Sequence, residues 1–292
     1  MKQPVKPLSV AEFVTLLAMM VSILALSIDA MLPALDDIGR DLGVAQANDV
    51  QLVVSAMFLG FAAGQMVAGP LSDSYGRKPV IYGGYVIFTA GCVMSMFAEN
   101  FTIMLAGRVL QGLGAAAPRI VSMALVRDGY EGRAMARILS IVMAIFILVP
   151  AIAPAMGQAV LLAASWRAIF GVLLGMALIA FAWFAVRQPE TLGIEARRKF
   201  SLRNIGGGII EALRFRAMIG YTVASGIIFG AFLGYLSSAQ QIFQSAYATG
   251  ELFVVYFGGV ALALGAASIF NSKVVMRFGM RYMTSRALAG LT

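Results

Sequence analysis

The chain has 292 residues, of which 60% are hydrophobic and only 12% are charged, and its net charge is +8. Soluble domains carry about twice that charged fraction, so the composition excludes an ordinary soluble domain and predicts an integral membrane protein. The single cysteine, Cys92, excludes an internal disulfide and a cysteine metal cluster, and the absence of histidine excludes a histidine proton relay. Any proton carrier must therefore be a carboxylate, and we expect no metal and no cofactor.

Apolar segments long enough to span a bilayer follow one another along the chain. The first six are joined by short gaps, and a long polar and basic gap separates them from the remaining segments. We expect an all-α polytopic membrane protein with about eight complete transmembrane helices and the start of a ninth near position 283. The eight segments lie at 11–34, 50–71, 79–98, 102–126, 136–161, 166–187, 217–240 and 252–275. The chain divides into an N-terminal six-helix bundle at 1–187, a cytoplasmic basic linker at 188–216 and a partial second bundle at 217–292.

The cations alternate from loop to loop. Of the 22 lysines and arginines, only Arg40, Arg108, Arg119 and Arg167 lie outside the N-terminal tail and every second loop. Cytoplasmic loops are the ones enriched in lysine and arginine. The pattern therefore predicts a multi-pass protein whose N-terminus is cytoplasmic.

Three ionisable residues lie well inside the predicted spans, where a charge costs about 2.5–3.5 kcal/mol on insertion scales. Asp29 is four residues before Pro33, which cannot donate a backbone hydrogen bond to the Asp29 carbonyl, so this turn is free to bend. We expect Asp29 to bind a proton or cation; the alternative is an aspartate just inside the outer headgroup region.

Arg108 and Arg119 are eleven residues apart, which places them on nearly the same stripe of one helix, roughly 16 Å apart along its axis. We expect these arginines, with Gln111 between them, to face an aqueous cavity or anionic partners. The alternative is that they are structural and bind backbone carbonyls of neighbouring helices.

Other polar and helix-bending residues fit a cavity between moving helices. Gln65, Tyr235 and Gln240 are candidates for its lining. Pro150, Pro154 and Gly157 are expected to bend or weaken the fifth helix, which suits either a moving gate or static packing. The sequence contains no GxxxxGK[ST] phosphate loop and no nucleophile or acid/base cluster, so we do not expect an enzyme.

The stretch GPLSDSYGRKP between the second and third spans resembles the signature loop of the major facilitator superfamily, G-x-L-x-D-R-x-G-R-K/R. Ser74 replaces the usual first arginine. In that family the aspartate of this loop latches two six-helix halves in the outward-facing state, so the resemblance implies a latch here. The matching residues are Gly69, Leu71, Asp73, Gly76, Arg77 and Lys78.

Three further stretches resemble the drug:proton antiporters of that superfamily. LAGRVLQGLGAA carries the fourth-helix motif R-x-x-Q-G-x-G-A-A, whose arginine (here Arg108) is implicated in proton coupling in the family. The fifth-helix motif G-P-x-x-G-G is partly kept, at Pro154 and Gly157. SIDAMLPAL and VRDGY resemble the bicyclomycin-resistance-like (Bcr/CflA) branch, although Met123 stands where that branch has an arginine and Arg119 lies one turn earlier.

The resemblance implies a proton-driven exporter of small drug-like compounds in a bacterial inner membrane. Its partners would be a small-molecule substrate, protons and the lipid bilayer; we expect no nucleic acid, a monomer, and no energy source besides the proton motive force. Since the family has twelve helices, we expect that part of the second half is missing from this chain. Two alternatives remain open: an importer of a small organic solute or anion, and a non-transporting truncated remnant or scaffold.

Overall fold

The computed structural model describes residues 8–46, 48–201, 206–207, 210–211, 213–247, 252–278, 286 and 289–290. Nearly all of these residues are helical, and no strand occurs among them. This follows from the composition, because apolar segments inside a bilayer must satisfy their backbone hydrogen bonds internally, as helices do.

Each of the eight predicted spans corresponds to a long helix. These are α1 (Val10–Asp29), α3 (Leu52–Tyr75), α4 (Arg77–Met96), α5 (Phe101–Gly129), α6 (Gly132–Ala163), α7 (Trp166–Arg187), α9 (Arg216–Gln240) and α10 (Phe253–Phe278). The short elements are η1 (Leu32–Ala34), α2 (Leu35–Asp41), η2 (Asp49–Gln51), η3 (Ile194–Ala196) and the π-helical η4 (Gln241–Ala246).

The predicted polytopic all-α fold is confirmed. Seven of the described helices are long and apolar enough to cross a membrane, and in α10 the apolar part, Phe253–Ala267, is shorter. Of the predicted ninth helix, only residues 286 and 289–290 are among the described residues.

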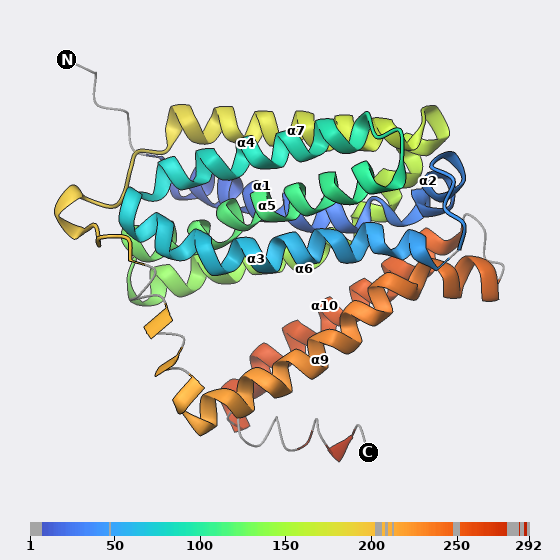
Figure 1. Cartoon of the computed structure of the whole chain (residues 1–292). Coiled ribbons are helices and arrows are strands. Elements are labelled where there is room, and N and C mark those ends of the chain that lie inside the picture. Colours follow the sequence, from blue (N-terminus) through green and yellow to red (C-terminus); the bar gives the residue numbers. More distant parts are fainter. Residues whose placement is uncertain are drawn as a thin grey trace.

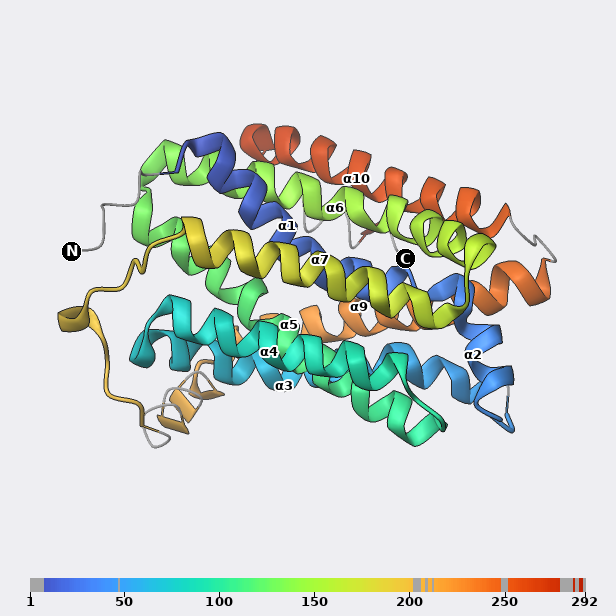
Figure 2. The same cartoon turned by 90° about the horizontal axis from the view of Figure 1, so that it is seen from above.

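Helix α1 is at the centre of the six-helix bundle, between α6 and α7 on one side and α5 on the other (Figure 2). Every residue from Met20 to Leu35 is buried. This central position explains why α1 is apolar around its whole circumference rather than on one stripe. It also means that any polar side chain in this stretch, such as Asp29, is enclosed by protein.

Helix α5 packs against α3 and α4 at backbone-to-backbone distance. A Cβ placed on Gly60 of α3 would lie 2.0 Å from the carbonyl oxygen of Val109, and one on Gly112 of α5 would lie 2.0 Å from that of Met57. Only glycine allows two helices to approach this closely. The glycines of the motif in α5 are therefore packing residues, and they hold α5 against both neighbours.

The turns gather at two ends of the bundle, as the charge pattern predicts. At one end, Arg77 at the start of α4 bonds Asp128 at the end of α5. At the other end, Arg167 at the start of α7 bonds Asp41 of α2 and the carbonyl of Ala98. The start of α1 and the segment after α7 lie at the Arg77 end (Figure 1).

Helices α9 and α10 run at an incline to the first six helices (Figure 1) and diverge from each other away from η4 (Figure 2). Near η4 they meet, where the ring of Tyr235 stacks on that of Phe257. Helix α10 runs along α6, as both views show, and the two helices are in contact. At the end of α9, the Gln241 side chain donates a 2.8 Å hydrogen bond to Asn48, which precedes η2. These contacts place α9 and α10 opposite the faces of α1, α3 and α6 that line the candidate site.

Candidate functional site

Asp29 ends α1 at a break in the helix. The chain turns through the 3₁₀ segment η1, which contains Pro33, before α2 begins. The side chain of Asp29 is only 3% exposed, and its Oδ1 atom has no hydrogen-bond partner among the described residues. A buried carboxylate oxygen without a partner is costly, and such groups are typical of sites that bind a proton or a ligand.

Asp29 and Arg119 line the same cavity, which has a volume of about 310 Å³. It lies between α1, α3, α5, α6 and α9, and Gln65 of α3 is its third polar residue. The other walls are apolar and largely aromatic: Leu24, Ala25, Ile28, Phe58, Phe61, Ile120, Phe146, Pro150, Phe229, Phe232 and Leu236. The structure places Asp29, Arg119 and Gln65 around one cavity. A concave apolar space with a few polar groups is typical of a small-molecule site.

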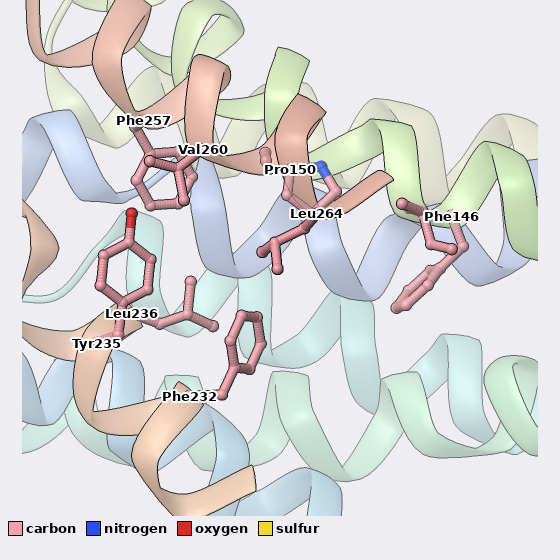
Figure 3. A pocket seen from close by; sticks show the side chains of 10 residues that line it. Phe146, Pro150, Phe232, Tyr235, Leu236, Phe257, Val260 and Leu264 are labelled. Carbon is pink, nitrogen blue, oxygen red and sulfur yellow. The ribbon is translucent and has the colours of Figure 1, made fainter. Parts of the chain in front are cut away.

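A second cavity of about 220 Å³ adjoins the first and shares Phe146, Pro150, Phe232 and Leu236 with it. Figure 3 shows this second cavity, enclosed by residues of α6, α9 and α10, with the Tyr235 hydroxyl directed toward Phe257. That hydroxyl has no hydrogen-bond partner in the part of the chain that the structure describes. Tyr235 therefore lines the neighbouring apolar cavity rather than that of Asp29, and the two spaces together suit an amphipathic molecule.

Arg108 is placed differently from Arg119, although the two share a stripe of α5. Its guanidinium is fully buried and donates hydrogen bonds to the carbonyls of Val53 in α3 (3.0 Å) and Ser27 in α1 (2.8 Å). It also bonds Gln111 Oε1 at 2.8 Å, while the Gln111 amide donates to Cys92 Sγ at 3.0 Å. Neither Arg108 nor Gln111 lines the Asp29 cavity. Of the two readings the sequence left open, the geometry of Arg108 fits the structural one.

The proline- and glycine-containing part of α6 lies against the break after Asp29. A Cβ on Gly157 would be 2.1 Å from the carbonyl oxygen of Ala30, so only glycine lets α6 come this close. Pro154 is buried and Pro150 lines both cavities, and α6 nevertheless continues as one helix from Gly132 to Ala163. The predicted bending residues thus form the wall of α6 that meets Asp29.

The turn between α3 and α4 is held by Arg77. Its guanidinium bonds Asp73 (2.5 Å) and Ser72 (2.8 Å) at the end of α3, and Asp128 (2.9 Å) at the end of α5. The Arg77 side chain is only 9% exposed and Asp128 is also shielded, so this ion pair is largely removed from solvent, whereas Asp73 is half exposed. Asp128 was not among the predicted site residues; the only signal for it was its place in the VRDGY stretch.

Glu190, in the segment after α7, caps the start of α4 and was also missed. Gly76 joins α3 to α4 with a φ of +105°, which favours glycine, and a glycine has no side chain to cap the helix. Glu190 supplies the cap, because its carboxylate accepts from the backbone N–H groups of Arg77 (2.9 Å) and Lys78 (3.0 Å). The same carboxylate accepts from the N–H groups of Thr191 and Leu192.

These contacts change the acidity of Glu190. Partial burial raises the pKa of its carboxyl, but hydrogen bonds from the N–H groups of Leu192, Arg77, Lys78 and Thr191 outweigh that effect, and the net pKa is lowered. Donors that bind the ionised form stabilise it. Glu190 is therefore an anion at neutral pH, as a cap at a helix N-terminus should be.

The remaining predicted residues of this turn have different surroundings. The Lys78 ammonium donates to the carbonyl of Ala185 at 3.1 Å, so it ties α4 to α7. A Cβ on Gly69 would meet nothing within 4 Å, so no close approach requires glycine there. The side chain of Gln240 lies outside the described residues.

A family model described as "Major Facilitator Superfamily" matches residues 15–292. The chain belongs to this superfamily. The predicted membership is thereby confirmed, and with it the expectation of a non-enzyme, because this is a family of transporters.

Curated relatives support the resemblance to the drug-efflux branch of the superfamily. The chain is 33% identical over 267 residues to the MFS-type transporter YdgK of Bacillus subtilis, covering 90% of this chain and 65% of YdgK. It is 28% identical to a bicyclomycin resistance protein homolog of Haemophilus influenzae (90% of this chain, 66% of that one). It is 31% identical to a chloramphenicol resistance protein of Pseudomonas aeruginosa, and the match covers 93% of this chain and 64% of that protein. The chain thus spans about two thirds of the length of these superfamily members.

Solved structures of the superfamily share the fold. A D-xylose-proton symporter matches with a TM-score of 0.69 at 15% identity, over 92% of this chain and 70% of the symporter. At this identity the match concerns the architecture alone. It agrees with the predicted helical bundle of the superfamily.

Proposed function

We propose that this superfamily member is part of a proton-driven transporter that exports small drug-like compounds from the cytoplasm across a bacterial inner membrane. The observation that carries the proposal is Asp29. It is the only carboxylate among the residues that line the cavity, and one of its oxygens has no partner. The drug-resistance names of two relatives support the same substrate class.

Proton and substrate would compete for Asp29. The ionised carboxylate accepts a hydrogen bond from a donor group of the substrate, and protonation of Asp29 from the outside removes that acceptor and releases the substrate. The apolar and aromatic walls would hold the body of the compound, with the adjoining cavity between α6 and α10 receiving its apolar end. Arg108 and Gln111 would act indirectly, by fixing α1 and α3 against α5 around the site.

Alternating access would move two bundles relative to each other. We propose the division predicted from the sequence: residues 1–187 as the first bundle, 188–216 as a linker, and 217–292 as part of the second. The turn that contains Gly69, Asp73, Gly76, Arg77 and Lys78 would stabilise one state. Pro150, Pro154 and Gly157 would let α6 adjust next to Asp29. We further propose a monomer with a cytoplasmic N-terminus.

The test uses inverted membrane vesicles that contain the full-length protein and an imposed pH gradient. Addition of an exported compound, for example chloramphenicol, should release protons from the vesicles. Asp29→Asn should abolish this release while the protein remains inserted, whereas Asp37→Asn, a surface aspartate of α2, should leave it unchanged. Full proton release in Asp29→Asn would refute the coupling role of Asp29.

One observation favours a second candidate, an importer of a small anion: Arg119 places a cation in the cavity. The same vesicles distinguish the two. Export by antiport dissipates the pH gradient only when substrate is added on the cytoplasmic face, which is outermost in inverted vesicles. Import by symport instead requires substrate inside the vesicles and moves it outward together with protons.

A further inference from the structure

Arg119 brings a positive charge into the Asp29 cavity without a counter-ion of its own. No ion pair between described residues includes Arg119, whereas five other arginine–carboxylate pairs are formed elsewhere. Its guanidinium contacts Met143 Sδ at 3.9 Å and lies over the ring of Phe146, 4.8 Å from the centroid. Both partners are on α6 and neither neutralises the charge.

The contact with Phe146 matters for specificity, because an aromatic face attracts cations. A cavity lined by several phenylalanines and one carboxylate would ordinarily suit a lipophilic organic cation. In this cavity the guanidinium of Arg119 already occupies the face of Phe146. The protein therefore places its own cation where an organic cation would otherwise bind.

The formal charge of the cavity follows from its lining. Among the described residues that line it, Asp29 and Arg119 are the only charged ones. With Asp29 ionised the cavity is neutral overall, and with Asp29 protonated it carries one positive charge. Without Arg119 the cavity would carry one negative charge with Asp29 ionised and no charge with Asp29 protonated. That pattern suits the exchange of a cation for a proton.

We propose that Arg119 determines specificity by excluding lipophilic cations, so that the ligands of this cavity are neutral or anionic aromatic compounds. The inference rests on the proposed function, since it takes the cavity to be the substrate site. The exclusion is a repulsion between like charges in a space with low dielectric constant, where such repulsion is much stronger than in water. Specificity of this kind arises from rejecting the wrong ligand as well as from binding the right one.

The test compares two probes that differ almost only in charge, tetraphenylphosphonium (cation) and tetraphenylborate (anion). Binding of each labelled probe is measured at pH 8 on the full-length protein in nanodiscs, with empty nanodiscs subtracted. In the wild-type protein the cavity is neutral overall with Asp29 ionised, so the cation should not bind more tightly than the anion. Arg119→Met leaves the charge of Asp29 alone in the cavity and should favour the cation by about tenfold or more, at the strength of a single charge–charge interaction in a protein.

Two controls separate the charge of Arg119 from its size. Arg119→Lys keeps the charge and should keep the wild-type ratio of anion to cation binding. Arg119→Gln should behave like Arg119→Met and serves in its place if the methionine variant does not insert. Asp29→Asn combined with Arg119→Met should lose the newly gained cation binding. Tighter binding of the cation by the wild type, or equal probe ratios in Arg119→Lys and Arg119→Met, would overturn the inference.

Failure of this inference can be told apart from failure of the proposed function, because probe binding does not require transport. If the wild type moves no drug and no protons but Arg119→Met gains binding of the cation, the exporter proposal fails and the role of Arg119 stands. If the wild type exports tetraphenylphosphonium in an Asp29-dependent manner, the exporter proposal stands and the role of Arg119 is refuted.

Discussion

The carboxylate of Glu190 accepts a 2.9 Å hydrogen bond from the backbone N–H of Arg77, a residue 113 positions earlier in the chain. Through this contact the segment after α7 caps α4, and the Arg77 side chain continues the connection to Asp128 of α5. The signature turn between α3 and α4 is thus held by two acidic residues from elsewhere in the chain, Asp128 at the end of α5 and Glu190 in the segment after α7. Because these contacts should stabilise the fold, their contribution can be measured by thermal unfolding, independently of transport.

Glu190→Ala should destabilise the protein by about 1–2 kcal/mol, the usual cost of removing a helix cap. Glu190→Gln should cost less, because its amide oxygen still accepts a hydrogen bond. Thermal unfolding in detergent, followed by circular dichroism, measures both. Glu195→Ala, which removes an exposed carboxylate in η3 of the same segment, is the control and should leave the melting temperature unchanged. Equal melting temperatures for Glu190→Ala and the wild type would show that the cap is dispensable.

The stability that Glu190 contributes should depend on pH. Its pKa in the folded protein is lowered from the ordinary value of 4.5, so folding favours the ionised form. The contribution is therefore complete above about pH 4.5 and is lost as pH falls through the lower folded-state pKa. The difference in melting temperature between wild type and Glu190→Gln should shrink on acidification across that range. A difference that grew as the pH fell would contradict the direction of the shift.

Arg108→Lys should destabilise the bundle although it conserves the charge. The guanidinium bonds carbonyls of both α1 and α3, and a lysine cannot reproduce that planar fork of donors. Each buried group left without a partner costs about 1–3 kcal/mol. We expect a loss of at least about 2 kcal/mol, measured by thermal unfolding. Arg40→Lys, at a surface arginine that is 75% exposed, is the control, and a similar effect of both substitutions would argue against the structural role of Arg108.

Gly157→Ala should displace α6 from the break in α1. Its Cβ would lie 2.1 Å from the Ala30 carbonyl oxygen, which belongs to the backbone and cannot rotate away. Overpacking of this kind costs about 1–3 kcal/mol. Gly175→Ala in α7, where a Cβ meets nothing within 4 Å, should be neutral or slightly stabilising, because alanine favours helices. Substrate binding and melting temperature should both fall in the first variant and not in the second.

Much of the fold was predictable because a bilayer constrains the composition of each short segment of the chain, whatever the rest of the chain does. A span needs about twenty apolar residues, and cations are retained on one side, so the positions of α1, α3 to α7, α9 and α10 follow from composition alone. Asp29 was predictable for the same reason, since a carboxylate inside an apolar span is costly wherever its neighbours lie.

The partners of Arg77 were not predictable. Asp128 and Glu190 lie 51 and 113 residues from Arg77, and no local pattern links residues over such distances. The two acids meet Arg77 only because the ends of α3, α5 and α7 are gathered at one end of the bundle.

The sequence by itself therefore determined which residues enter the membrane and which polar side chains enter with them. Only the tertiary structure decided what those side chains face. Arg108 and Arg119 occupy nearly the same stripe of α5, so helical periodicity could not separate them. At the level of Arg108, α1 and α3 are close enough to offer their carbonyls, whereas at the level of Arg119 the neighbouring helices enclose a cavity. The distance between neighbouring helices, which periodicity does not encode, gave two similar arginines different roles.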